Sequence, residues 1–78
     1  MTKIQILGSG CAKCQQLTRN AEAAATALGL DYQIEKVTAV DDIVAYGVMR
    51  TPALAVDGQL KAAGRVLSAD EIKPLLQS

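Results

Sequence analysis

The sequence predicts a small α/β fold in which three helices flank a four-stranded mixed sheet, in the order β-α-β-α-β-β-α. Three observations predict it: short segments in which polarity alternates, a longer segment with apolar residues at helical spacing, and an Asp57-Gly58 pair, a strong hairpin signal. A chain of 78 residues has room for one hydrophobic core, so residues 1–78 are expected to form one domain.

The first half of the chain is predicted to form a strand, a helix and a second strand. Residues 3–7 alternate in polarity, and Gly8 ends this strand. Residues 12–28 carry apolar and small side chains at three- and four-residue steps, and Gly29 is placed to cap the end of the helix. Residues 31–37 alternate with mixed polarity, which favours an edge strand. Because a helix joins the two strands, they are expected to be parallel.

The second half is predicted to add a short helix, a hairpin and a last helix. Residues 38–46 have a helical pattern, with Thr38 as the N-cap and Gly47 as the residue that stops the helix. Residues 53–56 are apolar on both faces, which favours a central strand. The hairpin turn then leads into a second edge strand at residues 59–63.

The last helix opens with a capping box, in which Ser68 and Glu71 are three residues apart. Pro74 lies inside this helix and removes one hydrogen bond, so a kink or an early end near Gln77 is expected. In the first strand, Gln5 does not fit a central position, and the sequence alone offers no account of it.

Composition excludes several classes of function. Eight basic and eight acidic residues are scattered singly, with no basic stripe, so nucleic acid is not an expected partner. The longest apolar run is far shorter than the roughly 20 residues that span a bilayer, and the first residues lack the apolar core of a signal peptide. A cytoplasmic monomer is therefore the expectation. In that compartment paired cysteines are more often catalytic or metal-binding than structural.

The chemistry-bearing motif is a Cys-x-x-Cys pair, Cys11 and Cys14, where the first strand gives way to the first helix. These are the only cysteines, and the chain has no histidine, so few reactions other than dithiol chemistry have their reagents here. A helix N-terminus and the Lys13 ammonium both stabilise a thiolate, which makes Cys11 the candidate nucleophile. A disulfide closing so short a ring adds little stability.

The arrangement resembles the thioredoxin superfamily over nearly the whole chain. It is most similar to the small thioredoxin- and glutaredoxin-like redox-active disulfide proteins of bacteria and archaea. The resemblance is carried by Gly-Ser-Gly-Cys-Ala-Lys-Cys at residues 8–14, by Thr51-Pro52 before a strand–Asp-Gly–strand hairpin, and by the terminal helix. Ala-Lys stands between the cysteines, where thioredoxins have Gly-Pro and glutaredoxins Pro-Tyr, and Gly10 replaces the tryptophan that precedes the first cysteine of thioredoxins.

This resemblance implies a thiol–disulfide oxidoreductase. Cys11 would attack a disulfide of a partner protein, and Cys14, one turn inside the helix, would resolve the mixed disulfide. A reductase or a low-molecular-weight thiol would restore the dithiol. No organic cofactor or metal is expected, because the sulfurs carry the electrons.

The resemblance also implies which residues contact the substrate. The Thr51–Pro52 bond would be cis, with Pro52 against the sulfurs and the Thr51 backbone pairing with an extended partner peptide. Gly10 and Lys13 complete the expected contact residues. Lys13 would stabilise the thiolate or contact an acidic partner. Alternatively, Lys13 is an exposed helix residue that serves only solubility.

Two other functions stay open at this point. Small copper chaperones also carry Cys-x-x-Cys after a first strand, and thiolates favour Cu(I), so a soft-metal carrier is the alternative function. Their β-α-β-β-α-β order differs from the order predicted here. A non-catalytic adaptor that only docks a partner is the third possibility.

Overall fold

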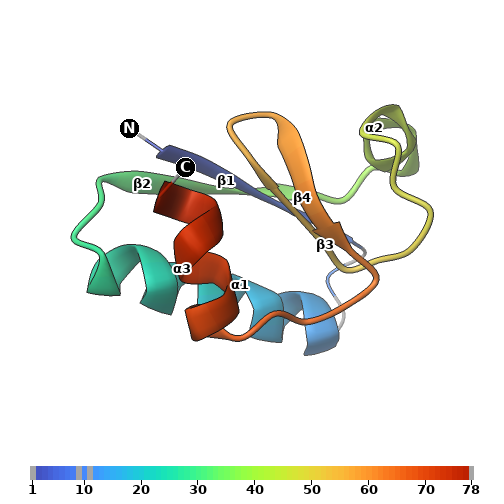
Figure 1. The fold of residues 1–78 in the computed structure, drawn as a ribbon. Coiled ribbons are helices and arrows are strands. Elements are labelled where there is room, and N and C mark those ends of the chain that lie inside the picture. The colour runs from blue at the N-terminus through green and yellow to red at the C-terminus, as the bar shows by residue number, and fades with distance from the viewer. Residues whose placement is uncertain (1, 9, 11, 78) are drawn as a thin grey trace.

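The computed structural model describes residues 2–8, 10 and 12–77. They form an α/β fold with the predicted order of elements (Figure 1). These are β1 (Thr2–Leu7), α1 (Ala12–Ala27), β2 (Tyr32–Val37), α2 (Val40–Ala45), β3 (Ala53–Val56), β4 (Gln59–Ala63) and α3 (Ala69–Gln77).

The four strands form one mixed sheet in the order β2-β1-β3-β4. β1 and β2 are parallel, whereas β1 and β3, and β3 and β4, are antiparallel. The predicted edge strands β2 and β4 and the central strand β3 are therefore confirmed. This topology brings the end of β1 beside the start of β3, with Leu7 paired to Ala53.

One face of the sheet is covered by α1 and α3, which lie together beneath it in Figure 1. Alternate residues of β1 and β3 point to this face, as period-2 alternation requires. The alanines of α1 let the helix approach the sheet closely. The main core consists of Ile4, Ile6, Leu17, Ala21, Ala24, Ala25, Leu54, Val56, Leu67, Ile72 and Leu76.

The opposite face of the sheet carries a smaller apolar cluster at the end near α2. Its buried members are Leu7, Val37, Val48, Ala53 and Ala55. Ile43 of α2 and Tyr46, which follows it, pack against this cluster, but α2 itself has no buried residue. The short helix is thus held by one side of its surface only.

The start of α2 differs from the prediction. Thr38 is not the N-cap: Ala39 occupies that position in an extended conformation, and no side chain caps the helix. The Ala39 carbonyl accepts the first hydrogen bond, from the Ile43 N–H at 3.0 Å. The contact of Ile43 with the sheet, and not a side-chain cap, fixes where this helix begins.

The β3–β4 turn is anchored to β1 through side chains. Asp57 (φ 52°) and Gly58 (φ 83°) both lie in the left-handed region, as a two-residue hairpin turn of this kind requires. Asp57 Oδ1 accepts a hydrogen bond from the Lys3 N–H at 2.9 Å. The buried Gln5 accepts one from the Gly58 N–H through Oε1 at 3.3 Å, which accounts for a polar residue in a central strand.

The capping box of α3 is confirmed. The Ser68 N–H donates to Glu71 Oε1 at 3.1 Å, and the Glu71 N–H donates to Ser68 Oγ at 3.2 Å. The backbone hydrogen bond from Ser68 is the main cause that lowers the pKa of the Glu71 carboxyl, and the nearby Arg65 guanidinium adds to it. The helix passes through Pro74 and runs to Gln77, where the described part of the chain ends.

Candidate active site

The candidate site lies where the end of β1 meets the first turn of α1. Cys14 is 4% exposed, and its sulfur packs against the backbone of Gly8. A β-carbon added to Gly8 would collide with Cys14 Sγ. The Gly8 N–H donates to the Val37 carbonyl at 3.0 Å, which holds Gly8 beside the end of β2. Gly8 therefore provides the space in which the sulfur sits.

The Thr51–Pro52 segment reaches the same place from β3. Its peptide bond is cis, the geometry that the resemblance implies, and Pro52 is fully buried. The Pro52 carbonyl accepts a hydrogen bond from the Gly64 N–H at 2.8 Å, so the end of β4 holds this segment in place. A β-carbon on Gly8 would lie 3.6 Å from Thr51 Cβ, on the same side as the Cys14 side chain. The fold thus brings Thr51 and Cys14 together around Gly8.

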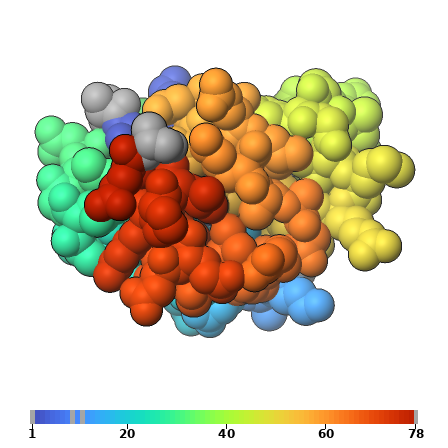
Figure 2. Space-filling model, in the orientation of Figure 1, coloured from blue at the N-terminus to red at the C-terminus, as the bar shows by residue number. Residues whose placement is uncertain are grey.

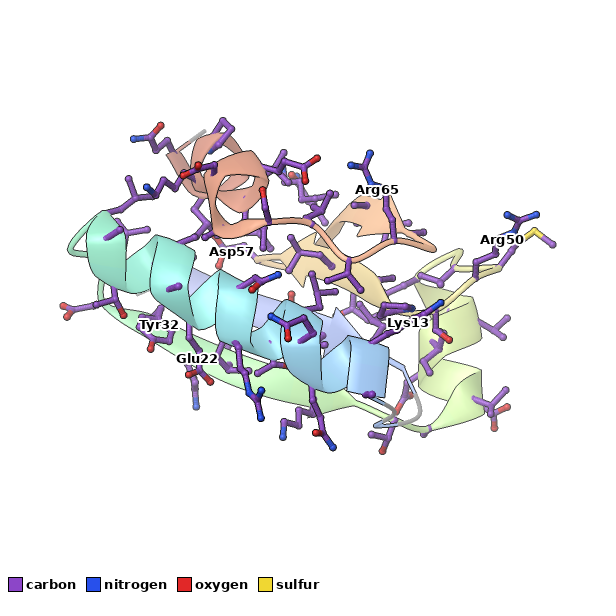
Figure 3. The ribbon with its side chains drawn as sticks, turned by 90° about the horizontal axis from the view of Figure 1, so that it is seen from below. Lys13, Glu22, Tyr32, Arg50, Asp57 and Arg65 are labelled. Atoms are coloured by element: carbon purple, nitrogen blue, oxygen red, sulfur yellow. The ribbon has the colours of Figure 1, made fainter. Side chains whose placement is uncertain are left out.

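The predicted nucleophile, Cys11, lies outside the described residues. The helix α1 begins at Ala12, the next residue in the sequence. Gly10 is exposed, and its φ of 83° is one that favours glycine, which gives a backbone reason for glycine before the first cysteine. Lys13 is exposed and, within residues 2–8, 10 and 12–77, forms no salt bridge (Figure 3).

A small hollow of about 70 Å³ adjoins Cys14. It is lined by Ile6, Gly8, Gly10, Cys14, Gln15, Thr18, Lys36 and Thr38. Thr18 Oγ1 donates to the Cys14 carbonyl at 2.9 Å, one helical turn away. Thr18 and Lys36 were not among the predicted site residues. The four-residue spacing from Cys14 to Thr18 is a sequence signal that points to Thr18. Lys36 has no such signal, because only the pairing of β2 with β1 brings it beside Ile6.

Neither a metal centre nor a membrane span emerges from the part of the chain that the structure describes. There, no three cysteine, histidine or acidic side chains come together in a way that could hold a metal ion. No described helix has both the length and the apolar character needed to cross a bilayer. The features that the fold assembles are a buried sulfur, a cis-proline segment and a helix start.

Comparison with known proteins decides the family. A sequence model described as a thioredoxin domain matches residues 2–77. The chain belongs to this thioredoxin-domain family. It is similar to a thioredoxin of Methanothermobacter thermautotrophicus, with 51% identity over 76 residues that make up 97% of this chain and 99% of the relative. A thioredoxin of Methanocaldococcus jannaschii is 41% identical over 78 residues, 100% of this chain and 90% of that protein.

A solved structure agrees with the thioredoxin fold. Thioredoxin-2, described as a component of malaria parasite protein secretion machinery, superimposes with a TM-score of 0.72 over 99% of this chain and 82% of its own. Their sequences are only 12% identical, so this likeness concerns the fold alone. Together with the two archaeal relatives, the family match makes the protein a thioredoxin-type redox protein, an oxidoreductase in kind.

Proposed function

We propose that this protein is a thiol–disulfide oxidoreductase that reduces disulfides of partner proteins through Cys11 and Cys14. The observation that carries the proposal is the buried Cys14 sulfur beside the cis Thr51–Pro52 segment, in a thioredoxin-type chain whose other cysteine is three residues earlier. Burial keeps Cys14 from reacting with a bulky partner directly. Its reaction is then limited to a sulfur that Cys11 has already engaged.

The reaction needs only the two sulfurs and the partner. The Cys11 thiolate attacks one sulfur of the partner disulfide; a Cys11–partner disulfide forms, and the other partner sulfur leaves as a thiolate. Cys14 then loses its proton and attacks the Cys11 sulfur, which forms the Cys11–Cys14 disulfide and releases the second partner thiolate. Overall the partner gains two electrons and two protons. A reductase or a low-molecular-weight thiol returns them to the protein.

The neighbouring residues support this chemistry without taking part in electron transfer. Proline has no N–H, so the backbone beside the Cys14 sulfur offers its pairing groups through Thr51, which is exposed. Lys13 and Gly10 are exposed at the start of α1, where they can meet the partner. In a cytoplasmic setting, a dithiol of this kind works as a reductant of its partners.

The test is a disulfide-reduction assay with two single variants. The native protein should reduce insulin with dithiothreitol as the electron source, and Cys11→Ser should abolish the activity. With dithiothreitol removed after reduction of the protein, Cys14→Ser should accumulate a one-to-one mixed disulfide between Cys11 and the partner, because the resolving thiol is gone. Full activity in both variants would contradict the proposal. So would tight one-to-one Cu(I) binding without any disulfide exchange, the result expected of a soft-metal carrier.

A further inference from the structure

The segment that leads into the cis proline has few contacts of its own backbone. Among the described residues, no hydrogen bond involves the backbone of residues 48–51. Val48 is buried in the smaller apolar cluster and Pro52 is fully buried, whereas Met49, which lies between them, is 94% exposed. A segment of this kind opens at a low free-energy cost unless side chains hold it. The position of Thr51 therefore depends on what its neighbours contact.

The side chain of Arg50 makes such a contact with Gly64. A β-carbon added to Gly64 would lie 3.0 Å from Arg50 Cβ, 3.3 Å from Arg50 Cδ and 3.8 Å from Arg50 Cγ. The methylene groups of Arg50 thus lie along the Gly64 backbone, while its charged end reaches solvent in Figure 3. In Figure 2 the loop before β3 (yellow) stands at the right-hand edge of the molecule, next to the orange surface of β4 and the residues after it.

Gly64 connects this contact to the cis proline. Its N–H donates to the Pro52 carbonyl at 2.8 Å, and its α-carbon faces the methylene groups of Arg50. The two residues that flank Thr51 are therefore both held by the same glycine. Because Gly64 directly follows β4, the sheet fixes the point to which both contacts are made.

The charge of Arg50 has no partner that could do the same. No carboxylate forms a salt bridge with Arg50 in the described part of the molecule. Its contribution to the position of the segment therefore comes from the methylene groups. Thr51 in turn lies across Gly8 from the Cys14 sulfur, so a displacement of Thr51 changes the backbone that faces a bound partner.

We propose that Arg50 is a positioning residue for peptide substrates. Its methylene groups, packed on Gly64, hold the Thr51 backbone where an extended segment of the partner pairs with it. A small disulfide makes no such pairing, so its reduction does not depend on Arg50. This proposal rests on the proposed function and adds to it a residue that favours peptide disulfides over small ones.

The experiment separates the packing of Arg50 from its charge. Arg50→Met keeps an unbranched side chain without charge, Arg50→Lys keeps both properties, and Arg50→Ala removes both. Arg19→Ala, which changes an exposed arginine of α1, is the matched control. The substrates are the disulfide-linked homodimer of an uncharged alanine- and serine-based peptide with one cysteine, and bis(2-hydroxyethyl) disulfide. Single-turnover rates of the reduced protein are measured for both.

We expect Arg50→Ala to reduce the peptide disulfide about tenfold more slowly than the native protein, the factor that corresponds to about one lost hydrogen bond. Arg50→Met, Arg50→Lys and Arg19→Ala should stay within about twofold of the native rate, because their packing at Gly64 is kept. All four variants should reduce the small disulfide at the native rate.

Gly64→Ala tests the other side of the contact. Its methyl group occupies the place of the Arg50 side chain, so peptide reduction should slow as it does in Arg50→Ala, and the double variant should be no slower than the slower single variant. Gly29→Ala is the control for backbone strain, since Gly29 has a φ of 67° but no atom within 4 Å of an added β-carbon. It should reduce the peptide at the native rate.

The two substrates also separate this proposal from the proposed function. If the native protein reduces both but Arg50→Ala reduces the peptide at the native rate, or slows both substrates equally, the positioning proposal is wrong and the oxidoreductase assignment stands. Equal slowing in Arg50→Ala and Arg50→Met would assign the effect to charge and would also overturn it. If the native protein reduces neither substrate, both proposals fail.

Discussion

The sulfur of Cys14 lies against the backbone of Gly8, so closely that a side chain on residue 8 has no room. The requirement for glycine here is one of space, because Gly8 is not among the glycines with positive φ. At Gly10 the reverse holds: its φ is 83°, but no atom lies within 4 Å of an added β-carbon. Two glycines of one loop are thus required for different physical reasons.

Gly8→Ala should therefore destabilise the protein through its contact with the Cys14 sulfur. Forcing a methyl group into a filled space costs about 1–3 kcal/mol. Urea unfolding of the reduced protein measures this loss. The same measurement on a Cys14→Ala background is the matched control, because removing the sulfur removes the collision. A cost of Gly8→Ala that is equal in both backgrounds would show that the two residues are not coupled.

Residue 57 should tolerate asparagine but not valine. Its φ of 52° is accessible to aspartate and asparagine and disfavoured for β-branched residues, and its side chain accepts the Lys3 N–H. We expect Asp57→Asn to unfold close to the native protein, and Asp57→Val to lose about 1–3 kcal/mol of the free energy of unfolding. Asp31→Val, in an exposed loop without positive φ, is the matched control. Equal midpoints for the two variants at position 57 would contradict the turn geometry.

The capping box should make the free energy of unfolding depend on pH. The pKa of Glu71 is lowered in the folded state below its ordinary value of 4.5, so its charge stabilises the fold above that pH. The contribution is lost as the pH falls through the folded-state pKa. Glu71→Gln should lower the melting temperature at pH 7 by no more than a few degrees Celsius, because the carboxylate is exposed. If the difference in melting temperature between Glu71→Gln and the native protein persisted unchanged at pH 2, this prediction would be wrong.

The order of elements was predictable because local patterns determine it. Polarity alternation marks the strands, the alanine-rich periodicity marks α1, and Asp57-Gly58 marks the hairpin. The start of α2 was not predictable from Thr38, since the packing of Ile43 on the sheet decides it and that contact is remote in sequence. The role of Gln5 also needed the structure, because its partner, Gly58, is 53 residues away.

In the candidate site, too, the residues with distinctive chemistry were predictable, whereas the contacts between remote segments were not. Cys14 and the Thr51–Pro52 segment could be selected from the sequence because they carry recognisable chemistry. The contact of Gly8 with the Cys14 sulfur, and the position of Lys36 beside it, depend on how β1 meets α1 and β2. The exposure of Val40 and Val44 was not predictable, because the apolar residues of α2 look like core residues until the helix is found to have no buried side chain.

A redox titration of the Cys11–Cys14 couple tests the central claim most directly. The protein is equilibrated in dithiothreitol and glutathione buffers of graded potential, quenched with acid, alkylated and weighed by mass spectrometry. We expect a single two-electron transition between a dithiol form, detected with two alkyl groups, and an intramolecular disulfide that takes up none, with a potential of roughly −270 to −120 mV. Neither Cys11→Ser nor Cys14→Ser should show it. Failure of the native protein to form the Cys11–Cys14 disulfide at any potential would contradict the account.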